Sequence, residues 1–112
     1  MSNHYRFLCQ LLLVLLLLGC DSVADQKAEL FKQGSSFFEA GEYAKAQVHF
    51  VRMLRLDPED ATGRYWMGRA LEAQRMLRQA ASYYSAVLEV APEHREAKVY
   101  LARILLIVKD DK

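Results

Sequence analysis

The sequence carries no excess of charge of either sign. Its 15 lysines and arginines are balanced by 14 aspartates and glutamates, and the formal net charge is +1. A protein that grips a phosphate backbone needs a clustered basic surplus, because counterion release drives such binding. We therefore expect no nucleic-acid partner. An apolar share of 53% with 26% charged residues is typical of a globular chain, and 112 residues suffice for one small domain.

Signatures of catalysis are also missing from the sequence. It contains no nucleophile elbow, no phosphate-binding loop and no dinucleotide fingerprint. Neither His49 nor His94 has neighbours at a spacing that is typical of a metal site. We therefore expect neither catalytic activity nor a bound metal ion.

Long apolar runs are scarce as well. The one extended run reaches from Phe7 to Leu18, follows Arg6, and is 12 residues long with Cys9 and Gln10 inside it. A membrane-spanning helix needs about 20 apolar residues, so this run is too short to span a membrane comfortably. Its length and place are typical of a secretory signal.

The residues that close this run, Leu17-Leu18-Gly19-Cys20, resemble the lipobox of bacterial lipoproteins. The resemblance implies that residues 1–19 are removed and that Cys20 carries a diacylglycerol and an acylated amine. Several chains at about 0.8 kcal/mol per buried methylene make a firm membrane anchor. We expect no cofactor besides this covalent lipid, and no disulfide, because Cys9 leaves with the signal. The alternative is an ordinary signal peptide or an uncleaved anchor with an incidental cysteine.

Asp21 resembles the residue that retains lipoproteins of enteric bacteria in the inner membrane. The resemblance implies an anchor in the bacterial inner membrane, facing the periplasm, rather than one in the outer membrane. The alternative is that Asp21 only starts a polar linker. A linker from Asp21 to Asp25 reaches at most roughly 17 Å, so we expect the domain that follows to stay close to the lipid surface.

Beyond residue 25 the sequence repeats itself with a period of 34 residues. Four positions of different shape return at this spacing: Gly34 as Gly68, Ala46 as Ala80, Phe50 as Tyr84, and Pro58 as Pro92. A unit of this length, with two short amphipathic helices and a closing proline, resembles the tetratricopeptide repeat. The resemblance implies an all-α, right-handed superhelix of helix hairpins, with two repeats and one closing helix.

Apolar residues at helical spacing predict the boundaries of these units. The first helix is expected from about Gln26 to Ala40, with Ser22 or Asp25 as its cap and Gly41 in the turn that follows. The predicted organisation is a signal peptide (1–19), a lipidated cysteine with a short linker (20–25), a first repeat (26–58), a second repeat (59–92), and a closing helix or the first helix of an incomplete third repeat (93–112).

The two prolines mark the junctions between units. At the first junction we expect Pro58 to open the next helix, Asp57 to cap it, and Asp60 to favour the same helix start. Before Pro92 the aspartate is replaced by Ala91, so we expect a weaker helix start at the second junction.

The third unit has a first helix but no second one. Its last run, residues 104–108, is apolar on nearly every face, whereas the end of a stable solenoid normally presents a polar surface. An apolar patch of this kind indicates an assembly surface, for which we predict Ile104, Leu105 and Val108. The surface would bind a partner, a second copy or further repeats. The family also uses a lone closing helix as a cap, which is the interpretation that we favour.

The resemblance implies a protein or peptide partner bound to the concave face, which the first helix of each hairpin lines. The predicted groove residues are Phe31, Ser35, Phe38 and Glu39 in the first repeat, Thr62, Tyr65, Arg69 and Glu72 in the second, and Val99 and Arg103 in the closing helix. Aromatic rings offer rigid contact area and arginine can hold a carboxylate, so this lining suits an extended peptide or a helix. Arg69 could instead pair with Glu72 on the surface.

Two functions are compatible with this pattern. The first is a membrane-anchored, periplasm-facing scaffold that binds a protein partner, as similar lipoproteins do in the assembly of the envelope and pili, in secretion and in exopolysaccharide export. The second is a structural role, as the N-terminal segment of a longer repeat array or oligomer whose last helix is the assembly surface.

Overall fold

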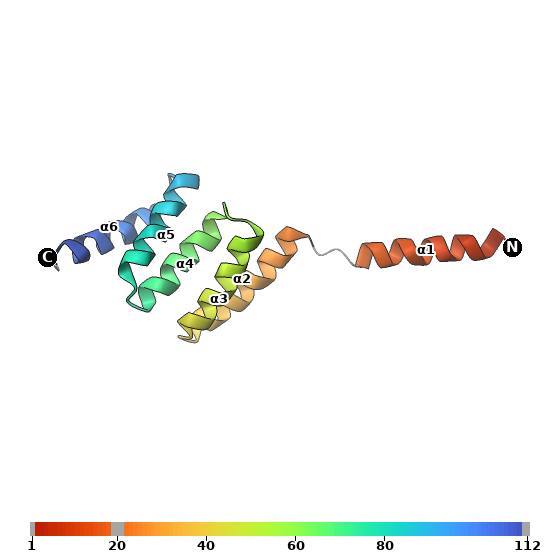
Figure 1. Ribbon diagram of the computed structural model, residues 1–112, viewed down its shortest axis with the longest axis horizontal. Helices are drawn as coiled ribbons and strands as arrows, with labels where there is room; N and C mark the ends of the chain where they lie inside the picture. Colours follow the sequence, from red (N-terminus) through yellow and green to blue (C-terminus); the bar gives the residue numbers. More distant parts are fainter. Residues whose placement is uncertain (1, 19–21, 111–112) are drawn as a thin grey trace.

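The computed structural model describes residues 2–18 and 22–110, and within them the chain forms helices only (Figure 1). The helices are α1 (Ser2–Leu18), α2 (Val23–Glu39), α3 (Tyr43–Leu56), α4 (Ala61–Ala73), α5 (Leu77–Val90) and α6 (Arg95–Asp110). None of the described helices is both long and apolar enough to cross a membrane. The predicted lipidation site, Cys20, and the predicted sorting residue, Asp21, lie outside the described residues.

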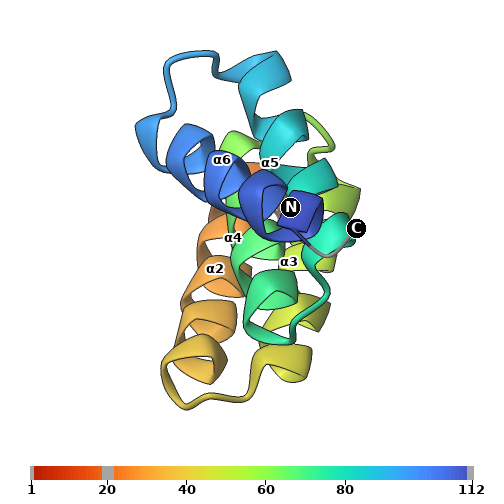
Figure 2. The same cartoon turned by 90° about the vertical axis from the view of Figure 1, so that its left-hand side faces the viewer.

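Helices α2 to α6 stack in the order of the sequence. Helices α2 and α3 form one hairpin, α4 and α5 form the next, and α6 packs on α5. Figure 2 looks along this stack with α6 nearest the viewer. This is the predicted all-α superhelix of two hairpins followed by one more helix.

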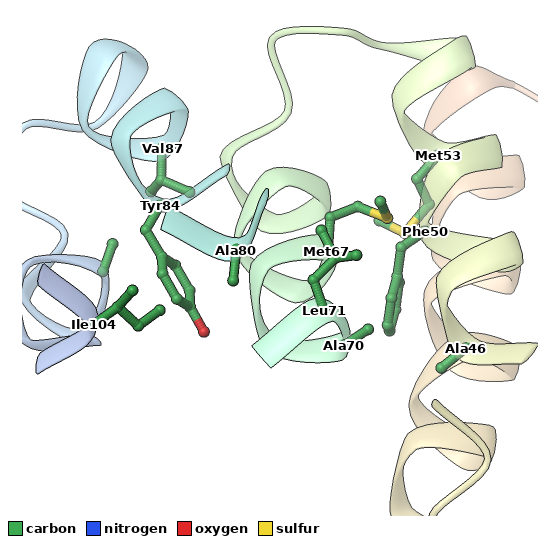
Figure 3. Packing of buried hydrophobic residues seen from close by; sticks show 11 residues of the cluster. Ala46, Phe50, Met53, Met67, Ala70, Leu71, Ala80, Tyr84, Val87 and Ile104 are labelled. Atoms are coloured by element: carbon green, nitrogen blue, oxygen red, sulfur yellow. The ribbon is translucent and has the colours of Figure 1, made fainter. Parts of the chain in front are cut away.

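The residues that define the repeat also define the core. Ala46 and Phe50 of α3 are fully buried, as are Ala80 and Tyr84 of α5, and they point into the layers between helices (Figure 3). Glycine is required opposite the two rings. A Cβ atom at Gly34 would lie 2.6 Å from a ring carbon of Phe50, and one at Gly68 would lie 2.6 Å from a ring carbon of Tyr84. The 34-residue period is therefore a period of close helix contacts.

Helix α2 begins three residues earlier than the sequence predicts. Ser22 is its N-cap, and the Ser22 hydroxyl accepts a hydrogen bond of 3.2 Å from the backbone N–H of Asp25. The choice between Ser22 and Asp25 as the cap is thus decided for Ser22. Asp25 lies in the first turn, where its negative charge favours the helix dipole.

The predicted junction around Pro58 is wrong in detail. Pro58 does not open α4, because it lies in a turn closed by a 3.2 Å bond from the N–H of Asp60 to the carbonyl of Asp57. The N-cap of α4 is Asp60, whose carboxylate accepts from the N–H of Thr62 at 3.2 Å. Asp57 ends α3 instead and accepts a 2.9 Å hydrogen bond from Lys27 of α2.

The junction around Pro92 keeps a cap that the sequence analysis missed. His94 stands 34 residues after Asp60, and its Nδ1 accepts a 3.2 Å hydrogen bond from the N–H of Ala97 in the first turn of α6. The His94 ring also lies 4.9 Å from that of Tyr65 on α4. The expected loss of a cap at Ala91 is therefore compensated three residues later.

The predicted assembly surface on α6 is only partly exposed. Ile104 is fully buried beside Tyr84 of α5 (Figure 3), and Val108, one turn later, is half-buried against the same core. Residues four apart share one helix face, so these two turn toward α5 together. Of the three predicted residues, Leu105 alone is exposed.

The outer face of α2 is polar. Glu29, Gln33 and Ser36 stand 34 residues before Gly63, Met67 and Ala70, which are buried in the second hairpin. On α2 the three polar residues are exposed, and the amide of Gln33 donates a 3.2 Å hydrogen bond to the carboxylate of Glu29. This row is the polar surface that normally ends a solenoid.

Candidate functional site

Arg69 of α4 lies at the centre of an aromatic cluster drawn from three helices. Its guanidinium carbon is 4.5 Å from the ring centroid of Tyr100 on α6 and 5.7 Å from that of Phe38 on α2. The centroids of Tyr65 and Trp66 on α4 are each 5.9 Å away, and Nη1 donates a 3.1 Å hydrogen bond to the Tyr65 hydroxyl. Cation–π contacts to several rings hold the guanidinium in place. Arg69 thereby connects the first helices of three successive units.

Glu72 interacts with α5 and α6. Its carboxylate accepts a 2.7 Å hydrogen bond from the Tyr84 hydroxyl and pairs with the guanidinium of Arg103. Arg103 also lies over Tyr100, at 4.7 Å from the ring centroid. Burial, and then the hydrogen bond to Glu72, raise the pKa of Tyr84 well above its usual range, so the hydroxyl remains a donor. Of the two roles open to Arg69 in the sequence, the structure therefore places it among the aromatic rings.

A hollow of about 360 Å³ opens beside this cluster. Its walls combine aromatic, basic and acidic side chains: Phe38, Tyr43, Arg69, Glu72, Ala73, Arg75 and Arg103. Four of them, Phe38, Arg69, Glu72 and Arg103, are among the predicted groove residues. The sequence analysis missed Tyr43 and Arg75, because Tyr43 begins α3 and Arg75 lies in the turn after α4, whereas the resemblance pointed to first helices alone.

The repeat period contains a signal that could have drawn attention to Arg75. Gly41, in the turn of the first hairpin, has a φ of 78°, and Arg75, exactly one period later in number, has a φ of 64°. Both turns need the left-handed conformation, which glycine adopts without a steric penalty and other residues do not. A charged residue at a glycine position of the turn costs stability, which is typical of residues kept for another purpose.

We expect Arg75→Gly to raise the free energy of unfolding by about 0.5–1 kcal/mol, because it relieves the left-handed strain. Urea unfolding followed by circular dichroism measures this change. The reverse swap at the matched turn, Gly41→Arg, is the control and should lower stability by a similar amount. Unchanged stability of Arg75→Gly would contradict the assignment of strain to this turn.

Two further predicted groove residues lie at the α2 side of the cluster. The ring of Phe31 is 6.0 Å from that of Trp66, edge to face, and both side chains are half-buried. Trp66 also contacts Phe38 and Phe50, so it packs between the two hairpins. The Ser35 hydroxyl oxygen is buried and has no hydrogen-bond partner among the described residues. Phe31 therefore contributes to packing at least as much as to the groove surface.

Three predicted groove residues stand away from the hollow. Glu39 at the end of α2, Thr62 at the start of α4 and Val99 on α6 are exposed, and none of them lines it. The structure thus gathers four of the ten predicted residues around one hollow and distributes the rest along the same helices.

Comparison with known proteins places this geometry in a family. Residues 31–77 and 67–110 match the model of the tetratricopeptide repeat. The chain belongs to the tetratricopeptide repeat family. Repeats of this family form scaffolds for protein–protein interaction.

The tetratricopeptide repeats of this chain are also similar to part of a larger protein. A stretch of 78 residues, 70% of this chain, is 32% identical to the "Probable biofilm formation methyltransferase WspC" of Pseudomonas putida strain KT2440. The chain spans 18% of the length of that protein.

The charge of the hollow indicates what the tetratricopeptide repeats can hold there. Three arginines line it against one glutamate, and that glutamate, Glu72, is already paired with Arg103. Arg75 forms no ion pair with any described residue, so its guanidinium is free for a ligand. Guanidinium groups bind carboxylates with two parallel hydrogen bonds, and rigid rings provide contact area. Within residues 2–18 and 22–110, no three His, Cys, Asp or Glu side chains are placed to hold a metal ion.

Proposed function

We propose that this chain is a lipid-anchored scaffold that faces the bacterial periplasm and binds a protein partner of envelope assembly. The observation that carries the proposal is the hollow beside Arg69, where helices of three successive units present rings and guanidinium groups to solvent. The family supports a protein partner. The resemblance of Leu17–Cys20 to a lipobox supports the anchor, and with it a partner in the cell envelope, such as a component of a pilus, secretion or exopolysaccharide system.

The proposed role is binding without chemistry of its own. The similar protein of Pseudomonas putida carries a methyltransferase name, but this chain spans 18% of its length. The matched stretch of 78 residues is about as long as the region that matches the repeat family. We attribute the similarity to the repeats, which act as a scaffold, and not to a methyl-transfer site.

We expect the double variant Phe38→Ala with Arg69→Ala to lose at least about tenfold in partner recovery, because the two residues form the centre of the groove. The measurement is affinity purification of the tagged chain from cross-linked envelopes, with circular dichroism to show that the helices remain. The matched control is Val48→Ala with Arg52→Ala on α3, which alters an exposed apolar and a basic residue away from the hollow. Equal recovery with the groove variant and the wild type would refute the groove.

A second function is favoured by the exposure of α6. Leu105 and Leu106 are 56% and 65% exposed, as expected if this helix is an assembly surface of a longer array or oligomer. A structural role of this kind shares the lipid anchor. It leaves the groove variant without effect on recovery, so the same experiment separates the two functions.

A further inference from the structure

Helix α6 repeats a contact position that has no contact. Gly34 and Gly68 receive the rings of Phe50 and Tyr84, each from the second helix of its own hairpin. The next position of this series is Ala102, which is again small but is exposed. A small residue at this register is where a neighbouring helix comes closest.

The apolar residues around Ala102 are uncovered for the same reason. Leu71 on α4 is 2% exposed because α5 covers it, whereas Leu105, one period later on α6, is 56% exposed. Val99 and Leu106, on either side, are 58% and 65% exposed. The outer face of α6, formed by Val99, Ala102, Leu105 and Leu106, thus presents the apolar surface that a second helix covers in the hairpin before it.

The chain itself offers no match for this face. At the other end of the stack, the outer face of α2 carries the exposed polar row of Glu29, Gln33 and Ser36. Placing that row on leucine side chains would remove its polar groups from water without new partners, which is unfavourable. A second copy therefore cannot stack with its α2 on α6.

Charge also excludes the pairing of two outer faces of α6 with each other. Arg95 and Lys109 lie two turns before and two turns after Ala102, on the same helix face, and both are exposed. In an antiparallel pair centred on Ala102, Arg95 of one copy would approach Lys109 of the other, and like charges repel. Lys98, which lies on this face too, adds a third positive charge to it.

The second hairpin shows how a basic residue at this place is used. Arg64 stands one period before Lys98, donates a 2.6 Å hydrogen bond to the carbonyl of Ala86 and lies 3.8 Å from the carboxylate of Glu89, both in the last turns of α5. A cation is favourable at the C-terminal end of a helix, where carbonyl groups are unpaired. Lys98 is placed to serve the end of a helix that covers α6.

We infer that the outer face of α6 binds an amphipathic helix of a partner protein, antiparallel to α6, with an aliphatic residue over Ala102 and an acidic C-terminal turn beside Lys98. The residue over Ala102 is aliphatic because Ala102 carries the Cβ that Gly34 and Gly68 omit to admit a ring. The face lies on the last helix of the stack, at the opposite end from α2 and its predicted anchor. The inference concerns a surface separate from the groove and does not rest on it.

The probe is a stapled, fluorescein-labelled peptide with the sequence of residues 77–90 and the change Tyr84→Leu, which has the form of the helix that covers α4 and keeps Glu89. Fluorescence anisotropy measures its binding to the full chain in phosphatidylcholine nanodiscs. We expect saturable binding that Leu105→Glu weakens at least about tenfold, since a charge is placed against apolar residues. Lys98→Glu should weaken it several-fold, and a peptide with Glu89→Lys should restore the binding of that variant.

The control chain carries Arg69→Ala, which alters the groove and should leave peptide binding unchanged. A scrambled peptide and empty nanodiscs should give no saturable signal. Leu105, Lys98 and their substitutes are exposed, so circular dichroism should show intact helices. Absence of saturable binding, or failure of the exchanged charges to restore it, would overturn the inference. Competition of unlabelled wild-type chain with the peptide would also overturn it, because a second copy would then occupy the face.

Discussion

Gly68→Val is expected to unfold most of the protein at room temperature. A Cβ at this position lies 2.6 Å from a ring carbon of Tyr84, and valine adds two methyl groups to it. The ring cannot move aside, because Tyr84 is fully buried, stacks on Tyr100 at 5.7 Å and is held by Glu72. Overpacking of this kind costs about 3 kcal/mol or more when the surroundings are rigid. A small domain has about 5 kcal/mol of stability in total, so the helices should separate.

The measurement is thermal unfolding followed by circular dichroism at 222 nm for helix content. The control is Gly41→Ala, which meets no neighbouring atom within 4 Å but requires a φ of 78°. It should cost only about 1 kcal/mol, through backbone strain alone. If both variants lost the same stability, close contact with Tyr84 would not be what requires glycine at position 68.

Cys20→Ser is expected to abolish lipid attachment completely. The thioether that the lipobox resemblance implies requires a sulfur nucleophile, and the serine hydroxyl does not replace it. The variant should incorporate no labelled palmitate and should accumulate as an unprocessed precursor or leave the membrane fraction. Because the anchor depends on several acyl chains, the effect should be all or none and not gradual.

Labelling with an alkyne-tagged palmitate, followed by fractionation of the cells, measures both results. Cys9→Ser is the matched control, because Cys9 is the other cysteine of the chain and lies in the predicted signal. It should keep both the label and the membrane location. A labelled band of unchanged strength in Cys20→Ser would remove the lipoprotein assignment while leaving the repeat fold and the groove untouched.

The architecture could be predicted from the sequence because each repeated position has a steric reason. Glycine returns where a ring approaches, alanine where two helices meet, and an aromatic residue where the core must be filled. Helical spacing then orients these residues, and the structure confirms an all-α stack of two hairpins and a sixth helix. The family match over residues 31–77 and 67–110 confirms the repeat.

The details that could not be predicted depend on groups distant in sequence or on single backbone angles. Asp57 looked like a helix cap but is engaged by Lys27, 30 residues away. Ile104 looked like part of an exposed run, but only its register against α5 decides that it is buried. Arg75 enters the hollow from a turn, which helical periodicity does not describe. Such facts emerge when the helices are placed in space.

The unequal ends of the stack set the subunit count of any assembly that this protein forms. Filaments grow when one surface of a molecule fits a different surface of the next copy and the rotation does not close. Here the charged and amide groups at one end cannot satisfy the hydrocarbon surface at the other, so growth stops before it starts. Even when crowded on a membrane, copies should remain discrete, and each should recruit its ligands in fixed stoichiometry.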